Sequence, residues 1–281
     1  MKKILSVVLA LIMVLGLCAC GGQTKKLAKV IEVELTQEEY AYGVDKNQPE
    51  LLEKVNAFID EIMKNGKFEE VCNHYFGDGK PVAVKSGTLD ASKADKQLVV
   101  ATNAAFEPFE YTEGDSYYGI DMEIAKLLAD YLGQELVISN MSFDAVCLSV
   151  GQQKADIAMA GLTVKEDRKE HVNFSKTYYN AAQKLITVST DKAFDECKTA
   201  EDVEKLLKAK TKAKIGVQTG TTGQFYVDGD EDWGFDGLGV KATGYANGSL
   251  AVQDLLNGNL DYVIIDSAPA KCITEAINKL R

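Results

Sequence analysis

Residues 98–111 read LVVATNAAFEPFEY, a strand-like run followed at once by polar and aromatic residues. The part from Leu98 to Thr102 is apolar and has the length of a buried strand. Asn103 and Phe106 therefore come just after a strand end. Because ligands of open α/β sheets collect at the carboxyl ends of strands, this stretch predicts an α/β fold with a binding site at that edge.

Strands and helices alternate downstream of this stretch. Asp121 is placed to cap a helix from about Met122 to Leu132, and Gly133 is placed to end it. The other expected strands lie at 136–139, 155–160, 214–217 and 261–265. The other expected helices lie at 143–151, after Gly220, at 249–256 and after Asp266. This alternation predicts mainly parallel sheets flanked by crossover helices.

The region upstream of residue 98 has a different pattern. Residues 49–64 carry apolar side chains at helical spacing, and a second short helix runs to about Phe76 after a break at Asn65-Gly66. Residues 78–96 are rich in Gly, Ser, Lys and Ala, which indicates an exposed linker.

The first residues have the features of a secretory signal. A basic start and an apolar run from Ile4 to Leu17, too short to span a bilayer, lead to small residues before Cys20. We expect cleavage after residue 19, a lipid on Cys20 and a tether over 20–27; an ordinary cleaved signal is the alternative. The prediction is a lipid-anchored protein on the extracellular face of the cell membrane.

Charge and composition narrow the class of partner. The formal charge is −11, and it becomes −13 without residues 1–19 because 29 basic residues then face 42 acidic ones. This balance argues against nucleic acid as a partner, since binding it requires a clustered basic face. Hydrophobic content of 46% and only 4 prolines are typical of a packed globule.

No metal motif is apparent. The cysteines beyond the lipid site fit no metal spacing, and free thiols are favoured over a disulfide, with Cys197–Cys272 the pair to test first. The acidic run at 228, 230 and 232 has odd spacing like a calcium loop, but Trp233 and Gly239 occupy the positions that need Gly and Glu. We expect a solvated acidic loop there.

Several motifs together carry a family resemblance. They are NAAFEPFEY, GIDMEIA, MSFDAV, AGLTVKEDR, VNFSKTYYN, GVQTGTT and VIIDSAPA. The chain resembles the polar amino-acid substrate-binding proteins of ABC transporters. The resemblance implies an α/β, two-lobed periplasmic-binding-protein type II fold, each lobe a mainly parallel sheet flanked by helices.

The order of the segments departs from that family. Residues 36–77 resemble the family's carboxy-terminal segment, yet here they precede its usual amino-terminal strand. We expect a circular permutation in which residues 78–96 join the ancestral termini. The expected lobe 1 is then 36–77 with 97–182, and the expected lobe 2 is 28–35 with 183–281. The alternative is an extra remnant at 27–80 on a truncated fold.

The resemblance also implies roles for individual residues. Arg168 would bind an α-carboxylate through its planar guanidinium, aided by Thr163, and Asp266 would accept the α-ammonium or act as a helix N-cap. Phe106 and Phe143 would sandwich the ligand side chain. The expected ligand-binding residues are Asn103, Phe106, Phe143, Ala160, Gly161, Thr163, Arg168, Gln218, Thr221, Thr222 and Asp266.

The implied function is a receptor that closes its lobes over a polar amino acid and presents it to an ABC permease. We expect a monomer without catalytic residues, cofactor or metal. Two alternatives remain open. One is an enzyme similar to cyclohexadienyl or arogenate dehydratases, with Glu107 or Glu110 as general acid. The other is a sensory ligand-binding protein.

Overall fold

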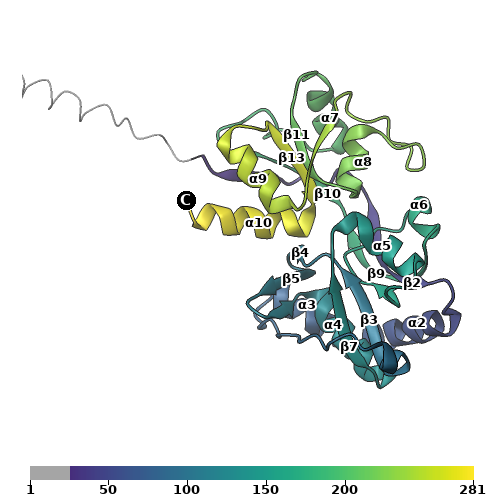
Figure 1. Cartoon of the computed structure of the whole chain (residues 1–281). Coiled ribbons are helices and arrows are strands. Elements are labelled where there is room, and N and C mark those ends of the chain that lie inside the picture. Colours follow the sequence, from purple (N-terminus) through teal and green to yellow (C-terminus); the bar gives the residue numbers. More distant parts are fainter. Residues whose placement is uncertain (1–25) are drawn as a thin grey trace, which may run out of the picture.

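The computed structural model describes residues 26–281 as two α/β lobes, one above the other in Figure 1. Cys20 and the expected signal lie outside the described residues. The strands are β1 (Ala28–Ile31), β2 (Glu38–Asp45), β3 (Gln97–Thr102), β4 (Ala105–Phe106), β5 (Glu110–Glu113), β6 (Ser116–Tyr118), β7 (Glu135–Asn140), β8 (Ile157–Ala158), β9 (Val172–Ala181), β10 (Gln183–Val188), β11 (Ile215–Gln218), β12 (Ala242–Tyr245) and β13 (Tyr262–Asp266). The helices are α2 (Pro49–Lys64), α3 (Lys67–Phe76), a 3-10 helix η1 (Ala91–Lys96), α4 (Ile120–Leu132), α5 (Phe143–Gly151), α6 (Glu166–Lys169), α7 (Ala200–Lys208), α8 (Thr222–Asp228), α9 (Gly248–Asn257) and α10 (Ser267–Lys279).

Lobe one is built on a sheet with strand order β7-β3-β8-β2-β9. Alternate residues of β3 face opposite sides of the sheet. Leu98 and Val100 belong to the cluster that includes residues of α2 and α4, whereas Ala101 belongs to the cluster around α5. Helices therefore cover both faces of this sheet. The small sheet β4-β5-β6 is part of the same lobe and follows β3 directly in the chain.

Lobe two is built on a sheet with strand order β1-β10-β13-β11-β12. Strand β13 divides its side chains in the same way. Val263 and Ile265 pack in the cluster with α9 and α10, and Tyr262 and Ile264 pack in the cluster with α7 and α8. Burial on both faces explains why this strand reads as a continuous apolar run.

The two-lobed α/β class is confirmed, and both sheets are mixed. Strand β3 pairs in parallel with β7 and β8, and β11 pairs in parallel with β12 and β13. The pairs β2–β8, β2–β9, β1–β10 and β10–β13 are antiparallel. The antiparallel pairs arise because the chain crosses between the lobes along strands, without a crossover helix at those points.

Two neighbouring crossings connect the lobes. Strand β9 of lobe one ends at Ala181, and β10 of lobe two begins at Gln183. The second crossing runs from β1 to β2 alongside it: Leu35 N donates to Gln183 O at 2.9 Å, and Gln183 N donates to Thr36 Oγ1 at 2.8 Å. Paired short crossings of this kind suit a hinge.

The two ends of the described chain meet in lobe two (Figure 1). Asn278, near the end of α10, accepts a hydrogen bond from Ala28 N at 2.9 Å and donates one to Ala28 O at 2.8 Å. Within residues 26–281, no helix combines the length and apolar character needed to cross a membrane.

Several local expectations need correction. Asp121 does not cap its helix: α4 begins at Ile120 with Gly119 as N-cap, and the Asp121 side chain turns inward. Strand β8 is shorter than the expected 155–160. The linker 78–96 is largely exposed but docked, since Val84 pairs with Tyr117 and Gly87 N donates to Leu136 O at 2.8 Å.

Candidate functional site

Arg168 is buried where the two lobes meet. It lies in the short helix α6 of lobe one, and its Nη1 donates to Thr163 O at 2.7 Å. Its Nη2 donates to Gly220 O of lobe two at 3.1 Å. The Phe143 ring lies 5.2 Å from the guanidinium carbon, a cation–π distance. The guanidinium is thus held in a fixed orientation by both lobes and by an aromatic face.

The loop before α6 supplies backbone and hydroxyl groups beside Arg168. Gly161 has a φ of +52°, and a Cβ there would meet Phe106 Cε1 at 2.9 Å, so only glycine fits this close approach. Ala160 next to it is also buried. The Thr163 hydroxyl donates to Glu38 Oε2 at 2.7 Å and lies 3.4 Å from the Thr222 hydroxyl of lobe two.

Asp266 ends β13 of lobe two and is buried. Its Oδ1 accepts a hydrogen bond from the Tyr40 hydroxyl at 2.5 Å. It occupies the N-cap position of α10, but its side chain makes no capping bond. Burial, reinforced by the charge of Glu38, raises the pKa of Asp266 to about 7. Burial and the Asp266 carboxylate raise the pKa of Tyr40 well above its usual value.

Two amide side chains meet across the lobes. Gln218, at the end of β11, donates through Nε2 to Asn103 Oδ1 at 3.1 Å, and Asn103 Nδ2 donates to Met141 O at 2.6 Å. Thr221 Oγ1 in turn donates to Gln218 O at 2.8 Å. The neutral pair therefore connects the carboxyl end of β3 to the carboxyl end of β11.

The two aromatic residues expected as a sandwich occupy different places. Phe106 stacks on Phe109, with centroids 6.0 Å apart, and packs against Gly161. Phe143 lies against Arg168 instead. No contact between Phe106 and Phe143 is among the ring contacts of the described residues.

The other predicted polar residues converge. Asn103, Thr163 and Arg168 of lobe one contact, respectively, Gln218, Thr222 and Gly220 of lobe two. Tyr40 and Asp266 add a further link between the lobes. This is a closed arrangement, in which the groups expected to bind a ligand bind one another.

Sequence reasoning missed Glu38. Its two carboxylate oxygens accept bonds from Thr36 Oγ1 at 2.6 Å, from Gln183 Nε2 at 3.0 Å and from Thr163 Oγ1. It therefore ties both hinge crossings to the loop that leads to Arg168. The signal available in the sequence was its place within the TQEEYAYGV stretch that resembles the family.

Two further buried carboxyl groups lie beside the site: Asp121, expected only as a helix cap, and Glu110, expected only as a general acid in the enzyme alternative. Asp121 Oδ2 accepts bonds from Gly161 N at 2.9 Å and Tyr178 Oη at 3.0 Å, and burial raises its pKa to about 7. Glu110 is fully buried, and neither of its oxygens has a hydrogen-bond partner among the described residues. Burial, with Asp121 and Asp266 nearby, raises the pKa of Glu110 well above its usual value, so it is held in the neutral form.

A pocket of about 290 Å³ lies beside Arg168. Phe143, Cys147 and Arg168 line it from lobe one, and Gly220 and Phe225 line it from lobe two. The four cysteines of the described chain are free, and Cys147 is the one that is buried. Within residues 26–281 no cluster of three or more His, Cys, Asp or Glu side chains is arranged to hold a metal ion.

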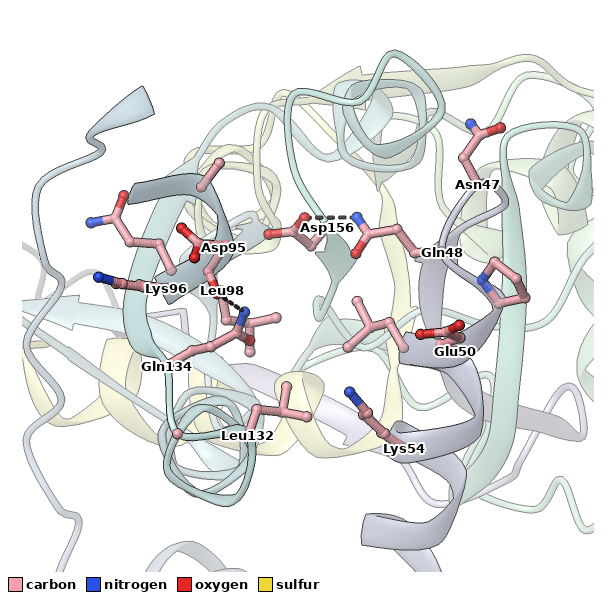
Figure 2. A pocket seen from close by; sticks show the side chains of 15 residues that line it. Asn47, Gln48, Glu50, Lys54, Asp95, Lys96, Leu98, Leu132, Gln134 and Asp156 are labelled. Carbon is pink, nitrogen blue, oxygen red and sulfur yellow. Dashed lines mark hydrogen bonds between the residues drawn. The ribbon is translucent and has the colours of Figure 1, made fainter. Parts of the chain in front are cut away.

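A larger pocket, of about 650 Å³, lies at the opposite end of lobe one (Figure 2). Gln97 and Leu98 at the start of β3 line it, so it is on the far side of the sheet edge from Asn103. Asp156 within it already accepts Gln48 Nε2 at 2.7 Å and Val99 N at 2.8 Å. The Asp156 carboxylate is therefore satisfied internally, and the closed arrangement around Arg168 remains the candidate site.

Comparisons with known proteins identify the family. The family of bacterial extracellular solute-binding proteins, family 3, matches residues 98–268. The arginine-binding extracellular protein ArtP of Bacillus subtilis is 32% identical over 50% of this chain and 50% of its own length. ABC transporter arginine-binding protein 1 of Escherichia coli is 30% identical over 65% and 68%. The chain therefore spans only half the length of the Bacillus relative.

Solved structures of amino-acid-binding proteins are also similar to this chain. The arginine-bound form of truncated ArgBP from T. maritima has a TM-score of 0.55 and 31% identity, covering 67% of this chain and 82% of that one. An ancestral amino acid-binding protein described as a precursor of cyclohexadienyl dehydratase has a TM-score of 0.55 and 29% identity, over 68% and 79%.

Proposed function

This chain belongs to the bacterial extracellular solute-binding proteins of family 3, and we propose that it captures a polar amino acid between its lobes for delivery to the transmembrane subunits of an ABC permease. One observation carries the proposal most directly. A buried guanidinium on lobe one, Arg168, and a buried carboxyl group on lobe two, Asp266, each bind a group of the opposite lobe at the lobe interface. Opposite charges from opposite lobes match the two ends of a zwitterion.

The proposed mechanism is a two-state hinge. An amino acid whose carboxylate binds Arg168 and whose ammonium binds Asp266 contacts both lobes only in the closed state, so it stabilises that state. In this structure the carbonyls of Thr163 and Gly220 accept hydrogen bonds from Arg168, and the Tyr40 hydroxyl donates one to Asp266. Ligand binding exchanges some of these internal contacts for stronger, charge-assisted ones.

The side chain of the ligand is proposed to be polar, with its identity open. The relatives are named for arginine, in Neisseria gonorrhoeae for histidine and in Escherichia coli for L-cystine. Asn103 and Gln218 offer amide groups, which supply donors and acceptors but no charge. Phe106, Phe143, Ala160, Gly161, Thr163, Thr221 and Thr222 complete the proposed binding set.

Tethering is the second part of the proposal. The extracellular location follows the family, and Cys20, followed by Gly21-Gly22, is proposed to carry a lipid that anchors the chain to the membrane. The protein is proposed to act as a monomer.

A circular permutation is the third part. The family match begins at residue 98, yet β2, from the preceding segment, lies between β8 and β9 in the sheet of lobe one. Likewise β1 pairs with β10 in lobe two, and Ala28 is hydrogen-bonded to Asn278. These contacts support a rearranged order with 78–96 joining the ancestral ends, because the early segments complete sheets formed by the later ones.

No observation favours an enzyme. The relatives are named as binding proteins, Glu107 is exposed, and Glu110 is fully buried. The function is tested by thermal unfolding of ligand-stripped protein with each of the twenty amino acids. A ligand at 100 times its Kd stabilises the folded state by about 2.7 kcal/mol, so one or a few amino acids should raise the Tm by several degrees. If none does, the proposed ligand class is wrong.

A further inference from the structure

The acidic run at 228, 230 and 232 is only partly the solvated loop that its composition indicates, because Asp230 is mostly buried while Asp232 is exposed. Lys165, the residue before α6 in lobe one, places its ammonium 3.1 Å from Asp230 Oδ2 and 3.6 Å from Asp232 Oδ2, both in lobe two. The same ammonium lies 3.0 Å from Asp167 Oδ2 of its own lobe and 4.6 Å from the Phe225 ring centroid of lobe two. The Lys165 side chain is only 3% exposed.

Asp230 is prearranged to receive this lysine. Its other oxygen, Oδ1, accepts a bond from Trp233 N at 3.1 Å. Its backbone exchanges two hydrogen bonds with Phe235, each 2.9 Å long. The Asp230 side chain is 14% exposed and the Asp232 side chain 54% exposed, so Asp230 is the partner less screened by water.

Most of these contacts exist only while the lobes are together. When the lobes separate, Lys165 keeps Asp167 but loses Asp230, Asp232 and the Phe225 face. The contacts therefore contribute to the free energy difference between the closed and open states, which is the quantity that controls how fast a trapped ligand leaves.

We infer that Lys165 is a positioning residue for ligand capture, a cross-lobe latch that with Asp230 and Phe225 stabilises the closed state and slows ligand release. The inference rests on the proposed function, but Lys165 is not among the residues assigned to the ligand. Loss of Lys165 should leave every proposed ligand contact in place, whereas loss of Arg168 removes one.

The test compares four variants: Lys165→Gln, Asp230→Asn, the double variant, and Lys165→Arg. Lys169→Gln is the matched control, because Lys169 pairs with Glu166 within lobe one and is 46% exposed.

L-arginine, L-histidine and L-cystine serve as probes, and stopped-flow fluorescence measures the rate at which each probe is released. We expect Lys165→Gln and Asp230→Asn each to speed release about tenfold, which corresponds to about 1.4 kcal/mol. The ligand-free Tm should stay near wild type.

The double variant and Lys165→Arg distinguish a latch from a merely structural role. The double variant should release its probe no faster than the faster single variant, because both changes break one interaction. Lys165→Arg should stay near wild type. Release from Lys165→Gln and Asp230→Asn at the wild-type rate overturns the latch. Should Lys165→Gln fail to fold, Asp230→Asn, in a surface loop, decides.

A second measurement keeps the latch distinct from the proposed function. If wild type binds none of the three probes, amino-acid capture fails for them, and small-angle X-ray scattering of the ligand-free proteins then decides. The latch predicts a larger radius of gyration for Lys165→Gln than for wild type and Lys169→Gln at 50 mM KCl. Equal radii would overturn it.

Discussion

The Tyr40 hydroxyl of lobe one donates to Asp266 Oδ1 of lobe two at 2.5 Å, inside a fully buried site. The carboxyl group proposed to accept a ligand ammonium is thus already bonded across the hinge. This bond favours the ionised form of Asp266, whereas burial and Glu38 oppose it. The Tyr40 hydroxyl therefore helps to keep Asp266 ionised, which is the form that binds an ammonium group.

Replacing Tyr40 by Phe should weaken amino-acid binding at pH 7. Without the hydroxyl, the pKa of Asp266 rises above about 7, so more of the protein holds a neutral carboxyl group. We expect about a tenfold loss of affinity at pH 7, by about 1.4 kcal/mol, and a smaller loss at pH 8.5 as Asp266 ionises. Titration calorimetry from pH 6 to pH 8.5 measures both. Tyr179→Phe is the control, since that ring stacks on Tyr40. A loss that does not change with pH would rule out this role of the hydroxyl.

Replacing Arg168 by Ala should abolish tight binding while leaving the fold intact. The guanidinium is the proposed partner of the carboxylate, and losing two charge-assisted bonds should raise the Kd at least about 100-fold. Lys169→Ala, one residue further along α6 and exposed, is the control. Calorimetry reports affinity and thermal unfolding reports the fold. Unchanged affinity in folded Arg168→Ala would disprove the carboxylate assignment.

The pH dependence of stability should report Asp121. Its pKa of about 7 in the folded state exceeds the usual Asp value, so the folded state holds more protons between pH 4 and 7. The free energy of unfolding therefore falls as pH rises through that range and levels off above about pH 7, with one such group giving a slope of up to about 1.4 kcal/mol per pH unit. Asp121→Asn keeps an oxygen for Gly161 N and Tyr178, so its stability should fall less steeply with pH.

Urea unfolding of wild type and Asp121→Asn at pH 5.5, 6.5, 7.5 and 8.5 measures the two slopes. Asp130→Asn, at an exposed Asp paired with Lys126 on the same helix, provides the baseline. Identical slopes in Asp121→Asn and wild type would mean that Asp121 does not titrate in this range.

The proposed permutation makes its own prediction. Because Ala28 and Asn278 are already bonded, joining Arg281 to Lys26 by a short linker and opening the chain within 78–96 should give a protein that folds and binds the same amino acid. Circular dichroism and calorimetry test this. A rearranged chain that cannot fold would argue against an ancestral order of that kind.

Local pattern was sufficient for much of the fold. The helices predicted at 49–64 and 143–151 have those bounds in the structure, because each carries its own periodicity and its own start. Strand β3, at the centre of the opening stretch, was one residue longer than expected. Each of these elements is specified within its own residues.

What the sequence did not reveal depends on contacts between distant residues. Asp121 looks like a cap locally, yet Tyr178 and Gly161 draw it inward. Strands β9 and β10 carry the chain from one lobe to the other, and they pair antiparallel with β2 and β1, the strands of the adjacent crossing. Asp230 has the composition of a solvated loop, and its partner Lys165 is 65 residues away in the other lobe. Spacing along the chain holds no signal for such pairs.

Calorimetric titration of the ligand-stripped protein with the twenty amino acids tests whether an amino acid binds between Arg168 and Asp266. We expect saturable binding of one or a few polar amino acids at one molecule per chain, and no tight binding of the same amino acid to folded Arg168→Ala. Absence of heat from every amino acid, with the wild-type protein folded, would contradict capture of an amino acid between Arg168 and Asp266.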